Sequence, residues 1–231
     1  MRHFVHLALV SASVCIAPAG AHAARPFVTD DARIVDEGGY QIETYVKRQR
    51  TFGEREFWFL PAANPFGRVE LTLGGIAVDS LPNGDSRALV AQAKTLLKPL
   101  EPNGVGYALT LGVIRLRSAT PAPRETNPYL NAIGSFSLRD DQVVIHANLG
   151  ARRDNGAGTT RPTWGLGSEI RLADHLWGIA EAYGERGEKP TGHLGVRFWV
   201  VPNRIQIDST LGYQDASPAR RFHTVGLRLL F

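Results

Sequence analysis

The sequence predicts an all-β fold: a single transmembrane, antiparallel, up-and-down β-barrel of about twelve strands. Three observations support this prediction. Apolar and polar residues alternate in one segment after another, the last segment ends on an aromatic residue, and the first residues have the pattern of an export signal. Alternation with a period of two is typical of a strand that has one apolar face and one polar face.

The last predicted strand, Arg221 to Phe231, shows this alternation most clearly. Alternate residues form an apolar face and a more polar face: His223, Val225, Leu227, Leu229 and Phe231 on the first, and Thr224, Gly226, Arg228 and Leu230 on the second. A final strand with a C-terminal phenylalanine resembles those of bacterial outer-membrane barrels, where the insertion machinery reads that residue. The resemblance implies the barrel-assembly machinery as a partner, through Phe231. The alternative is an edge strand of a soluble sandwich.

The N-terminal residues Met1 to Ala23 combine a basic start at Arg2, an apolar run and a small-residue exit. This pattern predicts a secretory signal peptide at residues 1–23, and therefore export. Cys15, the only cysteine, lies within the apolar run, so we expect a mature chain with neither a disulfide nor a thiolate metal site. No other stretch approaches the roughly 20 apolar residues of a spanning helix.

The remaining chain is predicted to be a periplasmic N-terminal segment at 24–38 followed by one barrel domain at 39–231. Strands are predicted near 39–48, 56–61, 68–77, 85–98, 104–116, 128–138, 143–152, 162–172, 176–186, 191–200, 205–213 and 221–231. The weakest of them, 56–61, is expected to end at Pro61. The formal net charge of +4 is scattered, which argues against nucleic acid as a partner.

The connections between these strands are predicted to alternate in length. Those near 139–142, 173–175 and 201–204 are short, whereas 118–127 and 153–161 are longer and richer in glycine, proline and charge. Outer-membrane barrels have short periplasmic turns and longer external loops. We therefore expect 118–127 and 153–161 to lie outside the cell.

Several short motifs suggest a family. The first half contains Arg25-Pro26-Phe27, Thr29-Asp30-Asp31, Gly38-Gly39 and Glu43; the second contains Asn127 to Leu130, His146 to Gly150, Trp164 to Glu169, Glu181 to Glu185 and Gly195 to Phe198. Together they resemble an outer-membrane transporter family associated with meta-pathway phenol degradation. The resemblance implies a barrel that takes up small, often aromatic, molecules. It brings no catalytic residue and no cofactor.

Placing the apolar alternates outward leaves polar side chains of both charge signs for the lumen. The candidate lumen-lining residues are Glu43, Lys94, His146, Asn148, Glu169, Arg171, Glu181, His193, Arg197, Asp208 and Arg228. One interpretation is an ion-pair network that fills and stiffens the barrel, and the other is a conduction or binding path. Glu43 and Arg228 lie at similar depths on the first and last strands, so we expect an ion pair between them across the seam.

Catalytic and metal sites receive little support. Outer-membrane phospholipases place a histidine two residues before a serine, and no histidine here has that neighbour. Ser168 or Asp208 could still meet His146 or His193 in space, which is a weak signal. The histidines are too dispersed for ligand spacing, so we predict no catalytic residue, no metal and no cofactor.

The sequence thus predicts a passive channel for small solutes, hydrophobic or aromatic ones among them, in the outer membrane of a Gram-negative bacterium. The expected partners are outer-membrane lipids with lipopolysaccharide, the assembly machinery and the solute. Two alternatives remain open: a closed structural barrel without transport, and an outer-membrane lipid-modifying enzyme.

Overall fold

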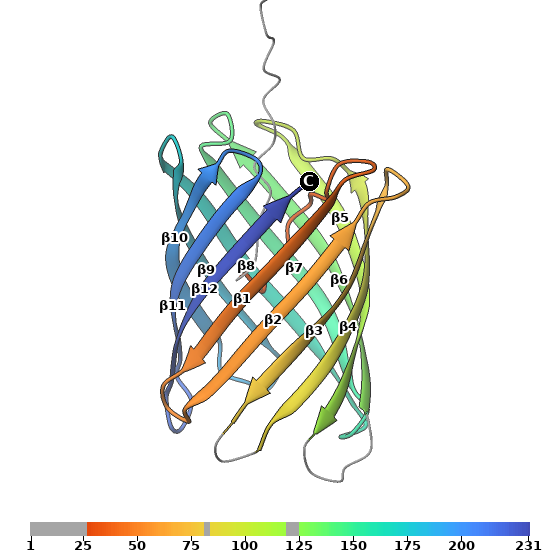
Figure 1. Cartoon of the computed structure of the whole chain (residues 1–231), viewed down its shortest axis with the longest axis vertical. Coiled ribbons are helices and arrows are strands. Elements are labelled where there is room, and N and C mark those ends of the chain that lie inside the picture. Colours follow the sequence, from red (N-terminus) through yellow and green to blue (C-terminus); the bar gives the residue numbers. More distant parts are fainter. Residues whose placement is uncertain (1–26, 81–83, 119–124) are drawn as a thin grey trace, which may run out of the picture.

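The computed structural model describes residues 27–80, 84–118 and 125–231, and these residues form a closed antiparallel barrel (Figure 1). Each strand pairs with its neighbours in the sequence, and the last pairs with the first, so the predicted fold is confirmed. The strands are β1 (Tyr40–Gln49), β2 (Glu54–Ala63), β3 (Val69–Asp79), β4 (Ser86–Lys98), β5 (Val105–Ser118), β6 (Glu125–Leu138), β7 (Val143–Asp154), β8 (Thr159–Ala173), β9 (Leu176–Glu185), β10 (Thr191–Val201), β11 (Ile205–Gln214) and β12 (Arg220–Leu230).

Closure depends on the pairing of β1 with β12. Gln41 lies opposite Leu230, and Gln49 lies opposite Phe222, so the register holds along the strands. Tyr40 and Phe231 exchange backbone hydrogen bonds of 3.2 and 2.9 Å at the end of the seam, and their rings stack at 4.7 Å. Closure leaves no unpaired strand edge, which a barrel in lipid requires.

The two ends of the barrel carry different sets of strand connections. We call the end that carries Tyr40 and Phe231 the turn end, because the connections after β2, β4, β6, β8 and β10 lie there (Figure 1). The opposite end, here called the loop end, carries the connections after β1, β3, β5, β7, β9 and β11. Strands β5 to β8 continue into the expected loops 118–127 and 153–161, which are therefore shorter than predicted.

Strand β2 also exceeds its predicted limit, because it passes through Pro61 to Ala63. Proline lacks the N–H that a ladder needs. Pro61 still lies in register opposite Ile42 of β1, while the pairing with β3 resumes at Ala62. On the β3 side, a Cβ at Gly74 would lie 2.3 Å from the backbone oxygen of Phe59, so only glycine fits there.

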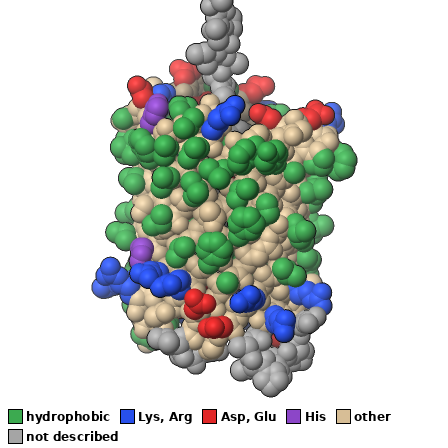
Figure 2. Space-filling view, in the orientation of Figure 1, with side chains coloured by type: hydrophobic (Ala, Val, Ile, Leu, Met, Phe, Trp, Pro, Cys, Tyr) green, Lys and Arg blue, Asp and Glu red, His purple; other side chains and the backbone are tan. Residues whose placement is uncertain are grey.

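The outer surface carries a band of exposed apolar side chains between the two ends (Figure 2). Leu73, Leu111, Leu149, Leu194 and Leu211 are among its most exposed members. The aromatic residues Tyr40, Tyr107, Trp164 and Tyr213 also face outward, whereas Trp177 and Trp199 are buried inside the barrel. The described residues contain no helix long and apolar enough to cross a membrane.

The interior of the barrel holds part of the chain itself. The expected signal peptide at 1–23 and residues 24–26 lie outside the described residues. From residue 27 the chain lies inside the lumen, where Phe27, Thr29, Asp31, Ala32 and Val35 are buried. We call residues 27–38 the inner segment. A segment expected to lie in the periplasm therefore fills part of the barrel, because its polar backbone finds hydrogen-bonding partners on the wall.

Candidate functional site: the barrel lumen

The predicted lumen residues lie inside the barrel with a single exception. Those that are buried on the inner face are Glu43, Lys94, His146, Asn148, Glu169, Glu181, His193, Arg197, Asp208 and Arg228. Arg171 is the exception, and its placement in the lumen was wrong. Its side chain is 44% exposed at the turn end and pairs with Asp174 at 3.2 Å, because β8 has reached the rim there.

One network runs along the wall from β6 to β11. Ser135 Oγ lies 2.8 Å from Nδ1 of His146, whose Nε2 lies 3.2 Å from Oε1 of Glu169. Arg197 donates to that same carboxylate oxygen at 2.8 Å, and to Asp208 at 2.9 Å. These side chains come from neighbouring strands and are almost fully buried. The predicted pairing of opposite charges is therefore realised on this side of the lumen.

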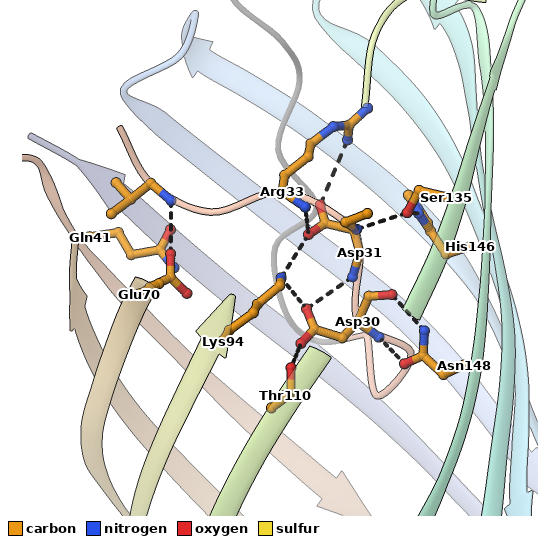
Figure 3. A network of polar contacts seen from close by, with 12 residues as sticks. Asp30, Asp31, Arg33, Gln41, Glu70, Lys94, Thr110, Ser135, His146 and Asn148 are labelled. Carbon is orange, nitrogen blue, oxygen red and sulfur yellow. Dashed lines mark hydrogen bonds and ion pairs between the residues drawn. The ribbon is translucent and has the colours of Figure 1, made fainter. Parts of the chain in front are cut away.

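A second network joins the inner segment to the opposite wall (Figure 3). Lys94 Nζ on β4 lies 2.7 Å from Oδ1 of Asp30 and 3.0 Å from Oδ1 of Asp31. Burial alone would raise the pKa of Asp31, but the charges of Lys94 and Arg33 outweigh it and hold that pKa well below its ordinary value of 3.8. The Asp31 carboxylate is therefore ionised, and it ties the segment to the wall.

The backbone of the inner segment is held by wall side chains as well. Glu181 on β9 accepts the N–H groups of Val28 and Thr29. Asn148 on β7 accepts from the Asp30 N–H at 2.7 Å and donates to the Asp30 carbonyl at 2.8 Å. These hydrogen bonds join wall side chains to main-chain N–H and C=O groups of the inner segment. They satisfy backbone groups that would otherwise be costly to bury.

The same pattern continues toward the turn end. Ser135 Oγ accepts the Ala32 N–H at 2.8 Å, and Glu70 on β3 accepts the Val35 N–H at 2.9 Å. The Asn64 side chain donates to the Val35 carbonyl at 2.8 Å. The segment thus contacts strands on opposite sides and crosses the lumen.

The sequence analysis missed three lumen partners of the segment: Ser135, Glu70 and Asn64. They follow the inward parity of their strands, but nothing in the sequence placed a segment against them.

The seam contains the predicted ion pair. Glu43 lies directly opposite Arg228, and Arg228 Nε is 3.5 Å from Oε1 of Glu43. The same Nε also donates to Oε1 of Gln41 at 2.9 Å. The prediction from strand depth and parity is therefore confirmed, and Gln41 is an additional partner.

A cavity of about 380 Å³ occupies the half of the lumen toward the loop end. Val28, Thr29 and Asp30 lie on its wall, so the inner segment bounds it. A second cavity of about 40 Å³ is lined by the same three residues together with Arg33, Glu70 and Lys94. The segment therefore lies between a large compartment and a small one.

The large cavity is lined by aromatic rings and by charged groups. Tyr45 and Trp58 stack with centroids 5.1 Å apart at an angle of 15°, and Phe222 lies on the same side of the barrel. Tyr129 and Tyr183 belong to the lining as well. The Lys47 ammonium lies 2.8 Å from Glu56 and 4.9 Å from the Phe222 ring centroid. Aromatic faces with few polar groups are typical of sites for small organic ligands.

The structure also shows where the considered catalytic groups lie. Ser168 has the opposite parity to Glu169 and so points away from the lumen, and Asp208 pairs with Arg197 rather than with a histidine. Ser135, His146 and Glu169 form a chain in the order of a nucleophile, a base and an acid, a combination missed in the sequence. All three are fully buried, and the serine oxygen is occupied by the Ala32 N–H.

With this geometry established, comparisons place the chain among known proteins. The family described as "Uncharacterised conserved protein UCP029691" matches residues 11–231. The chain belongs to this family. No curated protein matches. The narrower resemblance to the family linked to phenol degradation remains a prediction.

Two solved porins show a similar architecture. The KdgM porin in complex with disordered oligogalacturonate has a TM-score of 0.61 at 10% identity, over 82% of this chain and 98% of that chain. The NanC porin has a TM-score of 0.59 at 7% identity, over 81% and 98%. At this identity the likeness concerns the fold alone, so the chain has a porin-like barrel.

Proposed function

We propose that the protein is an outer-membrane channel for small solutes whose lumen is closed, in the conformation described, by the inner segment. The single observation that carries the proposal is the cavity of about 380 Å³, which the barrel strands surround and which the inner segment bounds on one side. A barrel that served only as a structural element would have no need for a compartment of this size. The porin-like fold and the apolar outer band support placement in a Gram-negative outer membrane.

The attachment of the inner segment fits a closure that can be released. It contacts the wall mainly through hydrogen bonds and through the ion pairs of Lys94 with Asp30 and Asp31. Water that enters the lumen can replace each of these hydrogen bonds at a small net cost, since a typical hydrogen bond contributes only about 1 kcal/mol, and it also hydrates the separated charges. Release would join the two cavities into a path lined by the polar wall.

The solutes that fit best are small and aromatic. The stacked pair Tyr45 and Trp58, together with Phe222, offers flat apolar surfaces, while Lys47 and Glu56 provide polar contacts at the edge. This lining is the independent support for the aromatic uptake that the sequence resemblance implies. In this proposal the solute moves passively through the barrel, down its concentration gradient and without a cofactor.

Conductance in planar bilayers tests the closure. The variant Asp30→Asn with Asp31→Asn removes both carboxylates that bind Lys94, so the segment should leave the wall and conductance should rise several-fold. Asp36→Asn is the matched control, because Asp36 lies on the same segment and is exposed. Equal conductance of the double variant and the wild type would contradict the closure.

Binding of phenol or benzoate tests the solute class, with cyclohexanol as a probe of similar size without an aromatic ring. Trp58→Leu should weaken binding of the aromatic probes by about tenfold, the size expected for one lost ring contact. Tyr213→Leu is the control, because Tyr213 faces outward on β11 and does not line the cavity. Equal binding of cyclohexanol and phenol to the wild type would exclude an aromatic preference.

A further inference from the structure

The outer surface at the loop end carries a series of arginines on strands β12, β1, β2, β4 and β5. We call the following residues the arginine belt: Arg221 on β12, Arg48 on β1, Arg55 on β2, Arg87 on β4, and Arg115 and Arg117 on β5. All six are exposed and have the parity of the outward-facing apolar residues of their strands. Figure 2 shows the basic side chains gathered below the apolar band, where the loop end lies.

The belt places like charges directly opposite one another. Arg48 on β1 lies in register with Arg55 on β2, and Arg87 on β4 lies in register with Arg117 on β5. Like charges in such positions repel and destabilise a strand pair. Among the described residues, none forms a hydrogen bond or ion pair with these four guanidinium groups. Asp79 lies in register with Arg55, but no ion pair joins them.

The other end of the barrel contrasts with the belt. None of its exposed basic residues lies opposite another basic residue in a strand pair; they are Arg68, Lys98, Arg139, Arg171 and Arg204. Acidic side chains are also frequent there, as in Glu101, Asp140 and Asp174. On the outward face of the described residues, arginines opposed in register therefore occur only at the loop end.

We infer that the arginine belt binds phosphate monoester groups of a glycolipid, in the manner of the lipid A part of lipopolysaccharide in the outer leaflet. The belt lies at the edge of the apolar band, the depth at which head groups begin, and it points away from the lumen, so a solute is not its partner. Guanidinium groups bind phosphate with paired N–H donors.

The opposed arginine pairs indicate the charge of the phosphate group that the belt would bind. Two guanidinium groups that face each other need close to two negative charges for neutrality. A phosphate monoester carries about −1.5 to −2 at pH 7, whereas a phosphodiester such as phosphatidylglycerol carries a single negative charge. The geometry therefore favours a monoester over the diester of a common phospholipid.

The test uses purified full-length barrel in detergent and three probes: bisphosphorylated lipid A, monophosphorylated lipid A and phosphatidylglycerol. Native mass spectrometry measures the bound lipid. Wild type should retain bisphosphorylated lipid A best. The variant Arg48→Gln, Arg55→Gln, Arg221→Gln should retain it at least about tenfold less, since each arginine near an anionic surface contributes on the order of 1 kcal/mol.

The matched control is Arg68→Gln, Lys98→Gln, Arg204→Gln, which removes the same number of positive charges at the turn end. It should bind lipid A as wild type does. Equal retention by the belt variant and wild type would overturn the inference, as would equal binding of phosphatidylglycerol and lipid A. Conductance measured on the same belt variant separates this inference from the proposed channel, because the belt lies outside the lumen.

Discussion

At the scale of single residues, the seam shows how a buried charge is accommodated. Arg228 is buried between Glu43 and Gln41, and it pairs with both across the junction of β12 and β1. Removing one partner of a buried ion pair leaves the other charge without compensation, which costs about 3 to 5 kcal/mol when the site is dry. Gln41 reduces this cost for Arg228, because its amide oxygen accepts a hydrogen bond from the same guanidinium group.

A double-mutant cycle measures this coupling. Arg228→Gln should destabilise the barrel more than Glu43→Gln does, because it removes the contacts of Arg228 with both Glu43 and Gln41, whereas Glu43→Gln leaves the bond to Gln41 in place. The double variant should be more stable than the sum of the single effects predicts, by about 0.5 to 3 kcal/mol. Urea unfolding in lipid vesicles and heat-modifiability on gels provide the measurement. As a control, Glu43→Gln with Arg152→Gln should be additive, since Arg152 pairs with Glu185 instead.

At the scale of elements, the strands could be predicted from the sequence and the inner segment could not. The period of two places Gln41, Glu43 and Arg228 on the inner face, because each strand has one apolar side. Strand ends such as those of β5 and β7 were missed, since polar residues beyond the apolar band still pair. Residues 27–38 have no period, and their partners are distant in sequence, as for Glu70 with Val35.

The attachment of the inner segment should depend on pH in a defined direction. The pKa of Asp31 is lower in the folded barrel than its ordinary value of 3.8, so its ionised form favours the docked segment. This stabilisation is complete above pH 3.8 and is lost as the pH falls toward the folded pKa. Conductance should therefore stay low between about pH 7 and 5 and rise below about pH 4. In Asp31→Asn, conductance should be raised at neutral pH and should change less on acidification. A rise that begins near pH 6 would instead show that a group other than Asp31 controls the opening.

At the scale of the whole molecule, the barrel is a rigid wall around a segment held by polar contacts. The wall has continuous strand pairing and buried ion pairs such as Arg197 with Glu169 and Asp208. The inner segment lacks strand pairing, although most of its side chains between residues 27 and 35 are buried. Local opening begins where backbone hydrogen bonding is weakest. The segment is therefore the element most able to move while the barrel stays intact.

A disulfide between the segment and the wall tests whether that movement opens the path. A Cβ built at Gly167 on β8 lies 3.6 Å from Cβ of Thr29, close to the mean of about 3.8 Å in disulfides. Thr29→Cys with Gly167→Cys should therefore form a disulfide bond. These two substitutions are introduced into the conducting Asp30→Asn, Asp31→Asn variant, in which Cys15 is also changed to Ser. Oxidised protein should conduct poorly, and dithiothreitol should restore the current. Thr29→Cys with Ser168→Cys is the control, because Ser168 faces the other side of the strand and cannot reach the segment. If the oxidised lock conducts as well as the reduced protein, solutes pass without displacement of the segment, and the closure must lie elsewhere.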